Sequence, residues 1–309
     1  MKAVQIDAFG GPEVLQVRDI ADPAPGPGEA LIDIHAATVN PADWKSRGGS
    51  YADPAEGYFP HILGRDFSGV VRELGDGAEG LSPGDEVYGV AVQGVDGAYA
   101  EAIAIDAGLV GLKPASISHD EAAALALTTL TAMIALEDTA RLTSGQKLLV
   151  QGGAGGVGSL GIQIGHHLGA HVITTASPGN HDYVSNLGAD EVIDYNSTDF
   201  TEAVSDCDVV FDTVGGEVHA RSFAVLKAGG RMVWIAGQPE GFTAPRDDVE
   251  VMRPNVKRAR AYMDRISEFI TAGAVKAPEM QFMSLDQVRE AHELSATGHV
   301  RGKIVFQVR

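Results

Sequence analysis

A glycine-rich loop is the strongest chemical signal in the sequence. It reads Gln151-Gly-Gly-Ala-Gly-Gly-Val-Gly158 and contains the pattern Gly153-x-Gly155-x-x-Gly158, directly after the apolar run Lys147–Gln151 and at the start of a helical segment. In that setting one glycine permits a tight turn, one lets a pyrophosphate approach the backbone, and one lets the helix pack closely on the strand. Free N–H groups at the start of the helix would bind the phosphates, so the loop predicts a dinucleotide-binding site rather than a merely flexible turn.

The end of the next predicted strand indicates which dinucleotide is bound. Proteins that bind NAD usually place Asp or Glu there, about 20 residues beyond the glycine loop, to hold the ribose hydroxyls. Here the strand His171–Thr175 is followed by Ala176-Ser177, without a carboxylate. The Ser177 hydroxyl tolerates a 2′-phosphate that an acid would repel, so NADPH is favoured. No Arg or Lys follows in this turn, where only Asn180 and His181 are available, and this limits the expected preference.

The elements that must position this loop follow two different patterns along the chain. Residues 1–117 form short runs with strand-like alternation, broken by Gly and Pro turns, which predicts a β-rich, barrel-like domain. In residues 118–272, apolar runs that could be buried on both faces alternate with helical segments. That alternation predicts an α/β fold with a Rossmann-type, doubly wound parallel sheet. Residues 273–309 return to short strands, and we expect them to rejoin the first domain.

Composition and charge exclude several classes of partner. The chain has 309 residues, which is enough for about two domains. Its 23 Lys and Arg residues face 42 Asp and Glu residues, giving a formal net charge of −19. Such a polyanion is repelled by nucleic-acid phosphates and by anionic membranes, so neither is an expected partner. The sequence does not begin like a signal peptide, and no apolar run looks long enough to span a bilayer, so we expect a cytoplasmic protein.

Further motifs are distributed along most of the chain. They are Val39-Asn40-Pro41-Ala-Asp43-Trp44-Lys45, Leu63-Gly64-Arg65-Asp66-Phe67-Ser68-Gly69, Gly84-Asp85-Glu86-Val87, Leu187-Gly188-Ala189-Asp190-Glu191-Val192-Ile193-Asp194-Tyr195, Phe211-Asp212-Thr213-Val214-Gly215-Gly216 and Gly302-Lys303-Ile304-Val305. Together with the glycine loop they resemble the zinc-free medium-chain dehydrogenases/reductases of the quinone oxidoreductase (zeta-crystallin-like) family. The resemblance implies a GroES-like catalytic domain, a Rossmann domain and an active site in the cleft between them.

The resemblance also bears on metal binding. Zinc alcohol dehydrogenases of the same superfamily carry a zinc cysteine where this chain has Asn40-Pro-Ala-Asp43, and a His-Glu pair where it has Arg65-Asp66. Catalytic zinc needs about three N, S or O ligands, and structural zinc typically needs four thiolates. Because the chain has one cysteine, Cys207, we expect no bound metal.

Roles for individual residues follow from the same resemblance. Asn40 and Lys45 would face the nicotinamide and the substrate, and Tyr51 lies where related 2-enoyl thioester reductases carry a proton-donating tyrosine. A structural turn, a solvated lysine and a packing tyrosine are the alternatives for these three. Cofactor contacts are expected at Thr131, Gly153, Gly155, Gly156, Val157, Gly158, Ser177, Tyr195, Val214, Gly237 and Lys303, the last near the phosphate end of the cofactor.

The expected reaction is hydride donation from NADPH to a quinone or a similarly electron-poor acceptor, for which the protein mainly supplies proximity. Reduction of an alkenal, enone or enoyl-thioester double bond is the enzymatic alternative, and a non-catalytic NADPH-binding protein is the alternative of another class. The resemblance further implies a homodimer, for which Gly230–Ala236 would be the edge strand of the Rossmann sheet.

Overall fold

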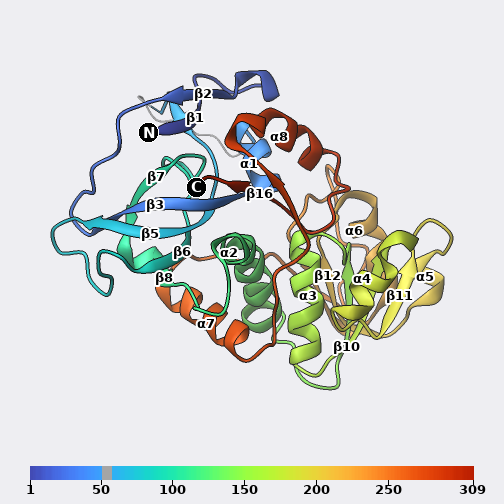
Figure 1. Cartoon of the computed structure of the whole chain (residues 1–309). Helices are drawn as coiled ribbons and strands as arrows, with labels where there is room; N and C mark the ends of the chain where they lie inside the picture. The colour runs from blue at the N-terminus through green and yellow to red at the C-terminus, as the bar shows by residue number, and fades with distance from the viewer. Residues whose placement is uncertain (51–57) are drawn as a thin grey trace. The chain divides into compact units, whose positions relative to one another are not determined.

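The computed structural model describes residues 1–50 and 58–309 of the chain (Figure 1). It divides into two compact units, one comprising Met1–Leu127 with Arg258–Arg309 and the other Thr128–Lys257. The first unit is therefore built from both ends of the sequence. Helix α7 (Arg260–Thr271) belongs to this first unit, where it packs on strand β8, although the predicted Rossmann domain extended to residue 272.

The first unit is built around a seven-stranded, mostly antiparallel sheet. Its longest strand, β3 (Glu29–Val39), pairs with β5 (Asp66–Leu74) on one side and with both β7 and β16 on the other. A second sheet has three strands in the order β2-β1-β4. The remaining strands are β1 (Lys2–Ile6), β2 (Gln16–Asp19), β4 (His61–Ile62), β6 (Glu86–Val90), β7 (Ala102–Asp106), β8 (Val110–Leu112), β15 (Met280–Met283) and β16 (Lys303–Gln307).

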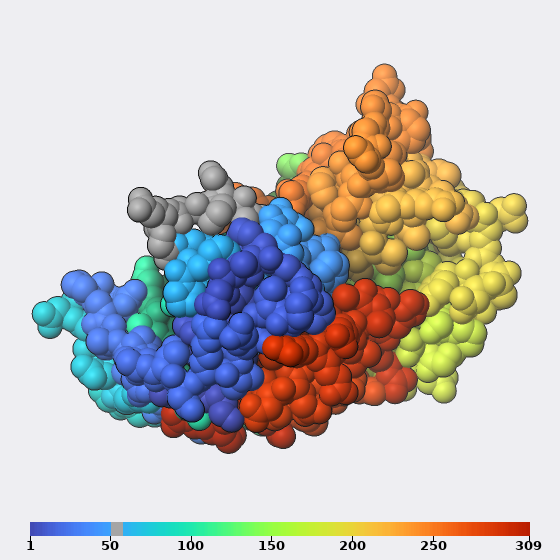
Figure 2. Space-filling model, turned by 90° about the horizontal axis from the view of Figure 1, so that it is seen from above, coloured from blue at the N-terminus to red at the C-terminus, as the bar shows by residue number. Residues whose placement is uncertain are grey.

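The C-terminal segment completes this unit. Helix α8 (Val288–Ala296) packs against the turn Pro12–Val14, and Figure 2 shows this red segment lying against the blue N-terminal strands. The shared core contains the fully buried side chains of Phe67 and Phe306, which come from opposite ends of the sequence. This buried apolar surface is what holds residues 258–309 in the first unit.

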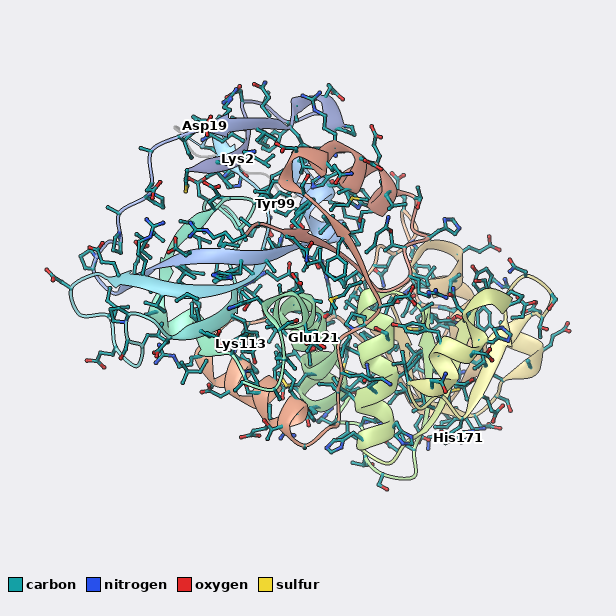
Figure 3. All side chains as sticks on the ribbon, viewed as in Figure 1. Lys2, Asp19, Tyr99, Lys113, Glu121 and His171 are labelled. Carbon is teal, nitrogen blue, oxygen red and sulfur yellow. The ribbon has the colours of Figure 1, made fainter. Side chains whose placement is uncertain are left out.

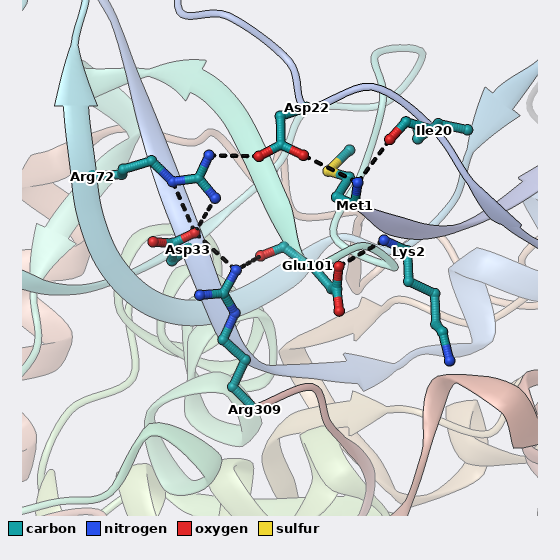
Figure 4. Close-up of polar contacts among 8 residues, drawn as sticks. All are labelled: Met1, Lys2, Ile20, Asp22, Asp33, Arg72, Glu101 and Arg309. Carbon is teal, nitrogen blue, oxygen red and sulfur yellow. Dashed lines mark hydrogen bonds and ion pairs between the residues drawn. The ribbon is translucent and has the colours of Figure 1, made fainter.

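Charged groups at the surface join the same segments (Figure 4). The amine of Met1 lies 3.1 Å from Asp22, and Arg72 contacts both Asp22, at 2.7 Å, and Asp33. Arg309 reaches Asp33 at 3.0 Å. Hydrogen bonding to Arg72 lowers the pKa of both aspartates. Exposed pairs of this kind contribute only ~0–1 kcal/mol each, so they fix local geometry more than they stabilise the unit.

The second unit is a six-stranded, wholly parallel sheet in the order β11-β10-β9-β12-β13-β14. Read from the first strand of the unit, that is the Rossmann order 3-2-1-4-5-6, and the predicted fold class is confirmed. The apolar run Leu148–Val150 in β9 is fully buried. The elements are β9 (Lys147–Gln151), α3 (Gly156–His167), β10 (His171–Ala176), α4 (His181–Asn186), β11 (Glu191–Asp194), α5 (Phe200–Ala203), β12 (Cys207–Asp212), α6 (Gly216–Ser222), β13 (Leu226–Trp234) and β14 (Glu250–Met252).

The predicted edge strand of this sheet is wrong. Strand β13, which contains most of the range Gly230–Ala236, is covered by β14 in a parallel pairing that sets Val233 beside Met252. Strand β14 has three residues and follows an irregular segment, so its sequence carries no strand-like alternation. The homodimer remains a prediction, but Gly230–Ala236 is not available to form it.

One helical stretch differs from the expectation that no apolar run is long enough to span a bilayer. Within the described residues, His119–Thr139 is long and apolar enough to cross a membrane, by length and composition. Its first part is α2 (His119–Met133), and 78% of its most apolar window is buried inside the molecule. That degree of burial is typical of a helix in a protein core.

A buried histidine of α8 is held in its neutral form. His292 is fully buried, its Nδ1 lies 3.0 Å from Arg47 Nη1, and its Nε2 lies 3.3 Å from Tyr99 Oη. Because a guanidinium can only donate, Nδ1 accepts and Nε2 carries the proton. Burial, together with the charge of Arg47, lowers the pKa of His292 to about 3.

This arrangement predicts a specific loss of stability in acid. The folded-state pKa of His292 lies below its unfolded value near 6.5, so the unfolded chain binds more protons as the pH falls below 6.5. We expect His292 to cost about 1.4 kcal/mol of unfolding free energy per pH unit below that point. Urea unfolding at pH 7.5, 6.0 and 5.0 measures it, with His292→Gln as the non-titrating comparison. Parallel pH dependences in the two proteins would contradict a neutral His292.

Candidate functional site

The candidate site residues fall into two groups, one in each unit. In the second unit, the glycine loop joins β9 to α3 at the carboxyl edge of the sheet. A Cβ at Gly153 would lie 2.1 Å from Thr174 Oγ1, and one at Gly158 would lie 2.2 Å from Gly152 O. At Gly155 the nearest such atom is 3.5 Å away. Packing inside the protein therefore requires Gly153 and Gly158, whereas the space beside Gly155 is open to a ligand.

Two buried polar side chains, Gln151 and Thr175, support the glycine loop through hydrogen bonds. Thr175 Oγ1 accepts from Gly152 N at 3.1 Å and donates to Gln151 Oε1 at 2.8 Å, and Thr175 O accepts from Gly153 N. The amide of Gln151 in turn donates to Ser222 Oγ at 3.1 Å. Sequence reasoning did not assign Gln151 or Thr175 a role. Gln151 was detectable only as a polar residue at the end of an apolar strand.

Predicted cofactor contacts beyond the loop lie at the ends of neighbouring strands. Ser177 follows β10, and its hydroxyl accepts from Asn180 Nδ2 at 3.1 Å. Tyr195 follows β11 and Val214 follows β12; they are 51% and 50% exposed, so both side chains present apolar surface to solvent. Gly237, after β13, is also exposed. In open α/β sheets ligands bind at this carboxyl edge, so these positions suit contacts with a dinucleotide.

Sequence reasoning missed a set of buried hydrogen bonds that links Asp212, His219 and Gln238 near this edge. Asp212, at the end of β12, accepts from the N–H groups of Val214 and Gly215 with Oδ1, both at 2.9 Å. Its Oδ2 lies 3.0 Å from Nδ1 of the fully buried His219, and Nε2 of His219 lies 3.1 Å from Gln238 Nε2. Because the carboxylate accepts at Nδ1, Nε2 accepts from Gln238. Asp212 thereby fixes the loop that carries Val214 and, through His219, the turn after β13.

In the first unit, Asn40 lies in a buried charged cluster. Its Nδ2 donates to Asp66 Oδ1 at 2.7 Å and its Oδ1 accepts from Lys303 Nζ at 2.6 Å. The Lys303 ammonium also donates to Val39 O at 3.0 Å and lies 3.6 Å from Asp66 Oδ2. Asn40 and Lys303 are 5% and 4% exposed. Both ends of the Asn40 amide are therefore occupied by partners within the unit.

Lys303, which was predicted to approach the phosphate end of the cofactor, contacts atoms of the first unit. An ammonium has three protons to donate, and here they face three atoms of the first unit: Val39 O, Asn40 Oδ1 and Asp66 Oδ2. Lys303 is therefore a counter-charge that fixes Asn40 and Asp66, and its contact with the phosphate end of the cofactor stays a prediction.

The other predicted residues are placed as follows. Lys45 is partly buried on helix α1 (Pro41–Arg47), with Nζ 5.3 Å from the centroid of the Trp44 ring. Thr131 is 8% exposed in α2. Tyr51 lies outside the described residues.

The described residues do not form a zinc site of the alcohol dehydrogenase type. Within residues 1–50 and 58–309, no group of three or more His, Cys, Asp or Glu side chains could hold a metal ion. Asn40 and Asp66 already bind Lys303 and each other. Burial raises the pKa of Cys207 to about 12, which disfavours the thiolate that zinc requires.

The second unit, with its glycine loop at the carboxyl edge of a Rossmann sheet, is a dinucleotide-binding domain by its geometry. The description "Alcohol dehydrogenase GroES-like domain" matches residues 26–115, and "Zinc-binding dehydrogenase" matches residues 187–306. Tomato 2-methylene-furan-3-one reductase is 37% identical, and Arabidopsis NADPH-dependent alkenal/one oxidoreductase (chloroplastic) is 34% identical; each match covers 99% of this chain and 79% of the relative.

Among solved structures, a quinone oxidoreductase from Coxiella burnetii superimposes with a TM-score of 0.92 at 35% identity, covering 100% of this chain and 99% of the other. The chain therefore belongs to the medium-chain dehydrogenase/reductase family of oxidoreductases, as a relative of its quinone oxidoreductases and enone reductases.

Two glycine substitutions test whether the loop binds a pyrophosphate beside Gly155. Gly155→Ala adds a methyl group that the protein accommodates, so the melting temperature should change by less than ~2 °C while NADPH affinity falls about tenfold or more, because the methyl group obstructs the pyrophosphate. Gly158→Ala places its methyl group against Gly152 O and should lower the melting temperature itself. Calorimetry and fluorescence titration with NADPH provide the measurements. Unchanged NADPH affinity in Gly155→Ala would rule out this phosphate site.

Proposed function

We propose that this protein is an NADPH-dependent reductase that transfers hydride to a quinone or a similarly electron-poor acceptor. The observation that carries the proposal is the glycine loop, in which the protein itself fills the space beside Gly153 and Gly158 but not that beside Gly155. The names of the relatives, which include quinone, enone and NADPH-dependent alkenal reductases, support this class of reaction.

The residues of the second unit bind and orient the cofactor in this proposal. Backbone N–H groups at the start of α3 receive the pyrophosphate, which suits a chain of net charge −19 that would otherwise repel it. Ser177 stands at the ribose, where a hydroxyl tolerates a neighbouring 2′-phosphate that a carboxylate would repel. Val214 and Tyr195 offer apolar surface at the same edge. When bound, NADPH supplies the hydride.

In the first unit, Lys45 is the residue we assign to the acceptor. Lys303 is occupied in the buried cluster, whereas Lys45 is partly buried, contacts the Trp44 ring and lies five residues beyond Asn40. A cation there would stabilise negative charge that develops on an acceptor oxygen. We infer that hydride transfer proceeds without zinc, because the residues at the corresponding positions do not form a zinc site.

Reduction of an enone double bond is the second candidate. The two curated relatives reported above, at 37% and 34% identity, are an enone-type reductase and an alkenal/one oxidoreductase. The reactions differ in their need for charge stabilisation. Oxygens of a reduced quinone take protons from water, whereas an enone passes through an enolate that a positioned cation or proton donor must stabilise.

Parallel assays with a naphthoquinone and with 3-penten-2-one separate these reactions. We expect chelator-washed protein to oxidise NADPH with the quinone at the higher kcat/KM. Lys45→Ala should lower turnover about tenfold with the quinone and on the order of 100-fold with the enone, because only the latter depends on enolate stabilisation. Lys2→Ala is the matched control, at a partly exposed lysine of β1 that pairs with Asp286. A higher kcat/KM with the enone would move the assignment to double-bond reduction. Absence of NADPH oxidation with both acceptors would contradict the proposed activity and would favour a protein that binds the cofactor without catalysis.

The cofactor preference is tested at the end of β10. The unmodified protein should bind NADPH about tenfold more tightly than NADH, which corresponds to ~1.4 kcal/mol. Ser177→Asp should reverse that order, because a carboxylate binds ribose hydroxyls and repels a 2′-phosphate. Ser177→Ala, which adds no charge, should keep NADPH preferred. Dissociation constants for both dinucleotides provide the measurement, and equal or tighter NADH binding by the unmodified protein would refute the assignment.

A further inference from the structure

Helix α1, which carries Lys45, is held by the carboxyl group of a buried aspartate. Asp43 is 1% exposed, and its Oδ2 accepts from Asn40 N at 2.8 Å and from Tyr99 Oη at 2.9 Å. The first contact closes the first turn of the helix. Oδ1 of Asp43 lies 3.7 Å from Arg65 Nε and has no hydrogen-bond partner among the described residues. The carboxyl therefore has donors on one oxygen and a positive charge beside the other.

Charged and titratable groups face Asp43 from every element around it. Arg65 directly precedes β5, Asp66 is its first residue, and Lys303 comes from β16. Tyr99, which Figure 3 labels inside the first unit, comes from the segment before β7. Behind Tyr99 lie His292 of α8, which contacts Tyr99 Oη, and Arg47 at the end of α1, which contacts His292. Burial raises the pKa of Asp43 to about 6; the charge of Asp66 adds to this, whereas Arg65, the Asn40 N–H and Lys303 oppose it.

A proton on Asp43 has no suitable acceptor among these contacts. Asn40 N–H and the Arg65 guanidinium can only donate, and Tyr99 keeps its own proton because its pKa lies well above the usual value. The Tyr99 oxygen already faces the Nε2 proton of His292. A proton on Oδ1, which has no hydrogen-bond partner among the described residues, leaves both donors on Oδ2, but the neutral carboxyl accepts from them more weakly and loses its attraction to Arg65. The contact with Asn40 N, where α1 begins, is one of the weakened contacts.

We propose that Asp43 is a positioning residue whose ionised carboxylate holds the start of α1, and with it Lys45, in the arrangement needed for turnover, and that proton uptake by Asp43 releases that arrangement. This inference rests on the proposed function, which places Lys45 at the acceptor. Asp43 itself touches neither acceptor nor cofactor in this proposal. Its protonation state decides how firmly the helix is held.

The pH profile of kcat/KM tests the role in turnover. In the unmodified protein, kcat/KM should fall about tenfold between pH 7 and pH 5, as expected for one ionised group with a pKa near 6. Asp43→Asn, which cannot ionise, should show low activity that changes less than about twofold over the same range. Asp19→Asn, an exposed carboxylate of β2, should keep the profile of the unmodified protein. An unchanged acid limb in Asp43→Asn would overturn the inference while leaving the proposed function intact.

A readout that needs no turnover comes from the neighbouring tryptophan. The chain has two tryptophans, Trp44 and Trp234, so Trp234→Phe leaves Trp44 as the only reporter. Its fluorescence should titrate near pH 6, and adding Asp43→Asn should abolish that titration. Adding Tyr99→Phe instead removes a donor to the carboxylate, so the midpoint should move to higher pH.

The outcomes separate the two claims. If Asp43→Asn does not fold, the Tyr99→Phe shift still decides, because an unmoved fluorescence midpoint and an unmoved acid limb would overturn the role of Asp43. A Trp44 titration that survives Asp43→Asn would do the same. A Trp44 titration that depends on Asp43, in a protein without turnover at any pH, would overturn the proposed function and with it the positioning role.

Discussion

The buried ammonium of Lys303 is the constraint on which the first unit depends. A charge with 4% exposure is tolerated only where it is paired and hydrogen-bonded, and here Val39 O, Asn40 and Asp66 meet that need together. These partners lie 264 and 263 residues away for Val39 and Asn40. Removing one partner of such a group leaves an uncompensated buried charge, which typically costs ~3–5 kcal/mol. Strand β16 is thereby fixed against the end of β3, where α1 begins.

Buried, hydrogen-bonded polar groups also fix the backbone in the second unit. Asp212 and His219 are fully buried beneath the carboxyl edge, and they hold backbone N–H groups and Gln238 rather than a ligand. The side chains that reach the surface there, Val214 and Tyr195, are uncharged. Each unit thus contains buried ionisable groups that act as fixed supports: Lys303 and Asp66 in the first unit, and Asp212 and His219 in the second. Such an arrangement preorganises a site without presenting further negative charge to an anionic cofactor.

The sequence predicted those features whose physical cause is local. The Rossmann sheet follows from apolar runs and glycine spacing, because strand burial and a tight phosphate loop constrain residue types directly. The motif around Lys303 could not show that its ammonium folds inward onto Asn40. Strand β14 was missed because its three residues pair only through the backbone with a strand already formed. Asp43 and Asp212 were visible within motifs, but their roles depend on burial, which spacing does not report. Tyr51 illustrates the opposite case: a role implied by resemblance on which the described residues have no bearing.

The direction of the pKa shift of Asp43 indicates that the chain retains this carboxyl for a reason other than stability. Its folded-state pKa of about 6 lies above its usual value of 3.8, so the folded protein binds the proton more tightly than the unfolded chain does. The associated stabilisation is fully present below pH 3.8 and is lost as the pH rises through 6, the reverse of the behaviour of His292. At neutral pH the ionised carboxylate therefore costs on the order of 3 kcal/mol relative to a group that does not shift. Apolar side chains of similar volume commonly stabilise a fold at least as well as buried ions. A buried, ionised aspartate in the first turn of α1 is best explained by the geometry that it imposes on the start of that helix.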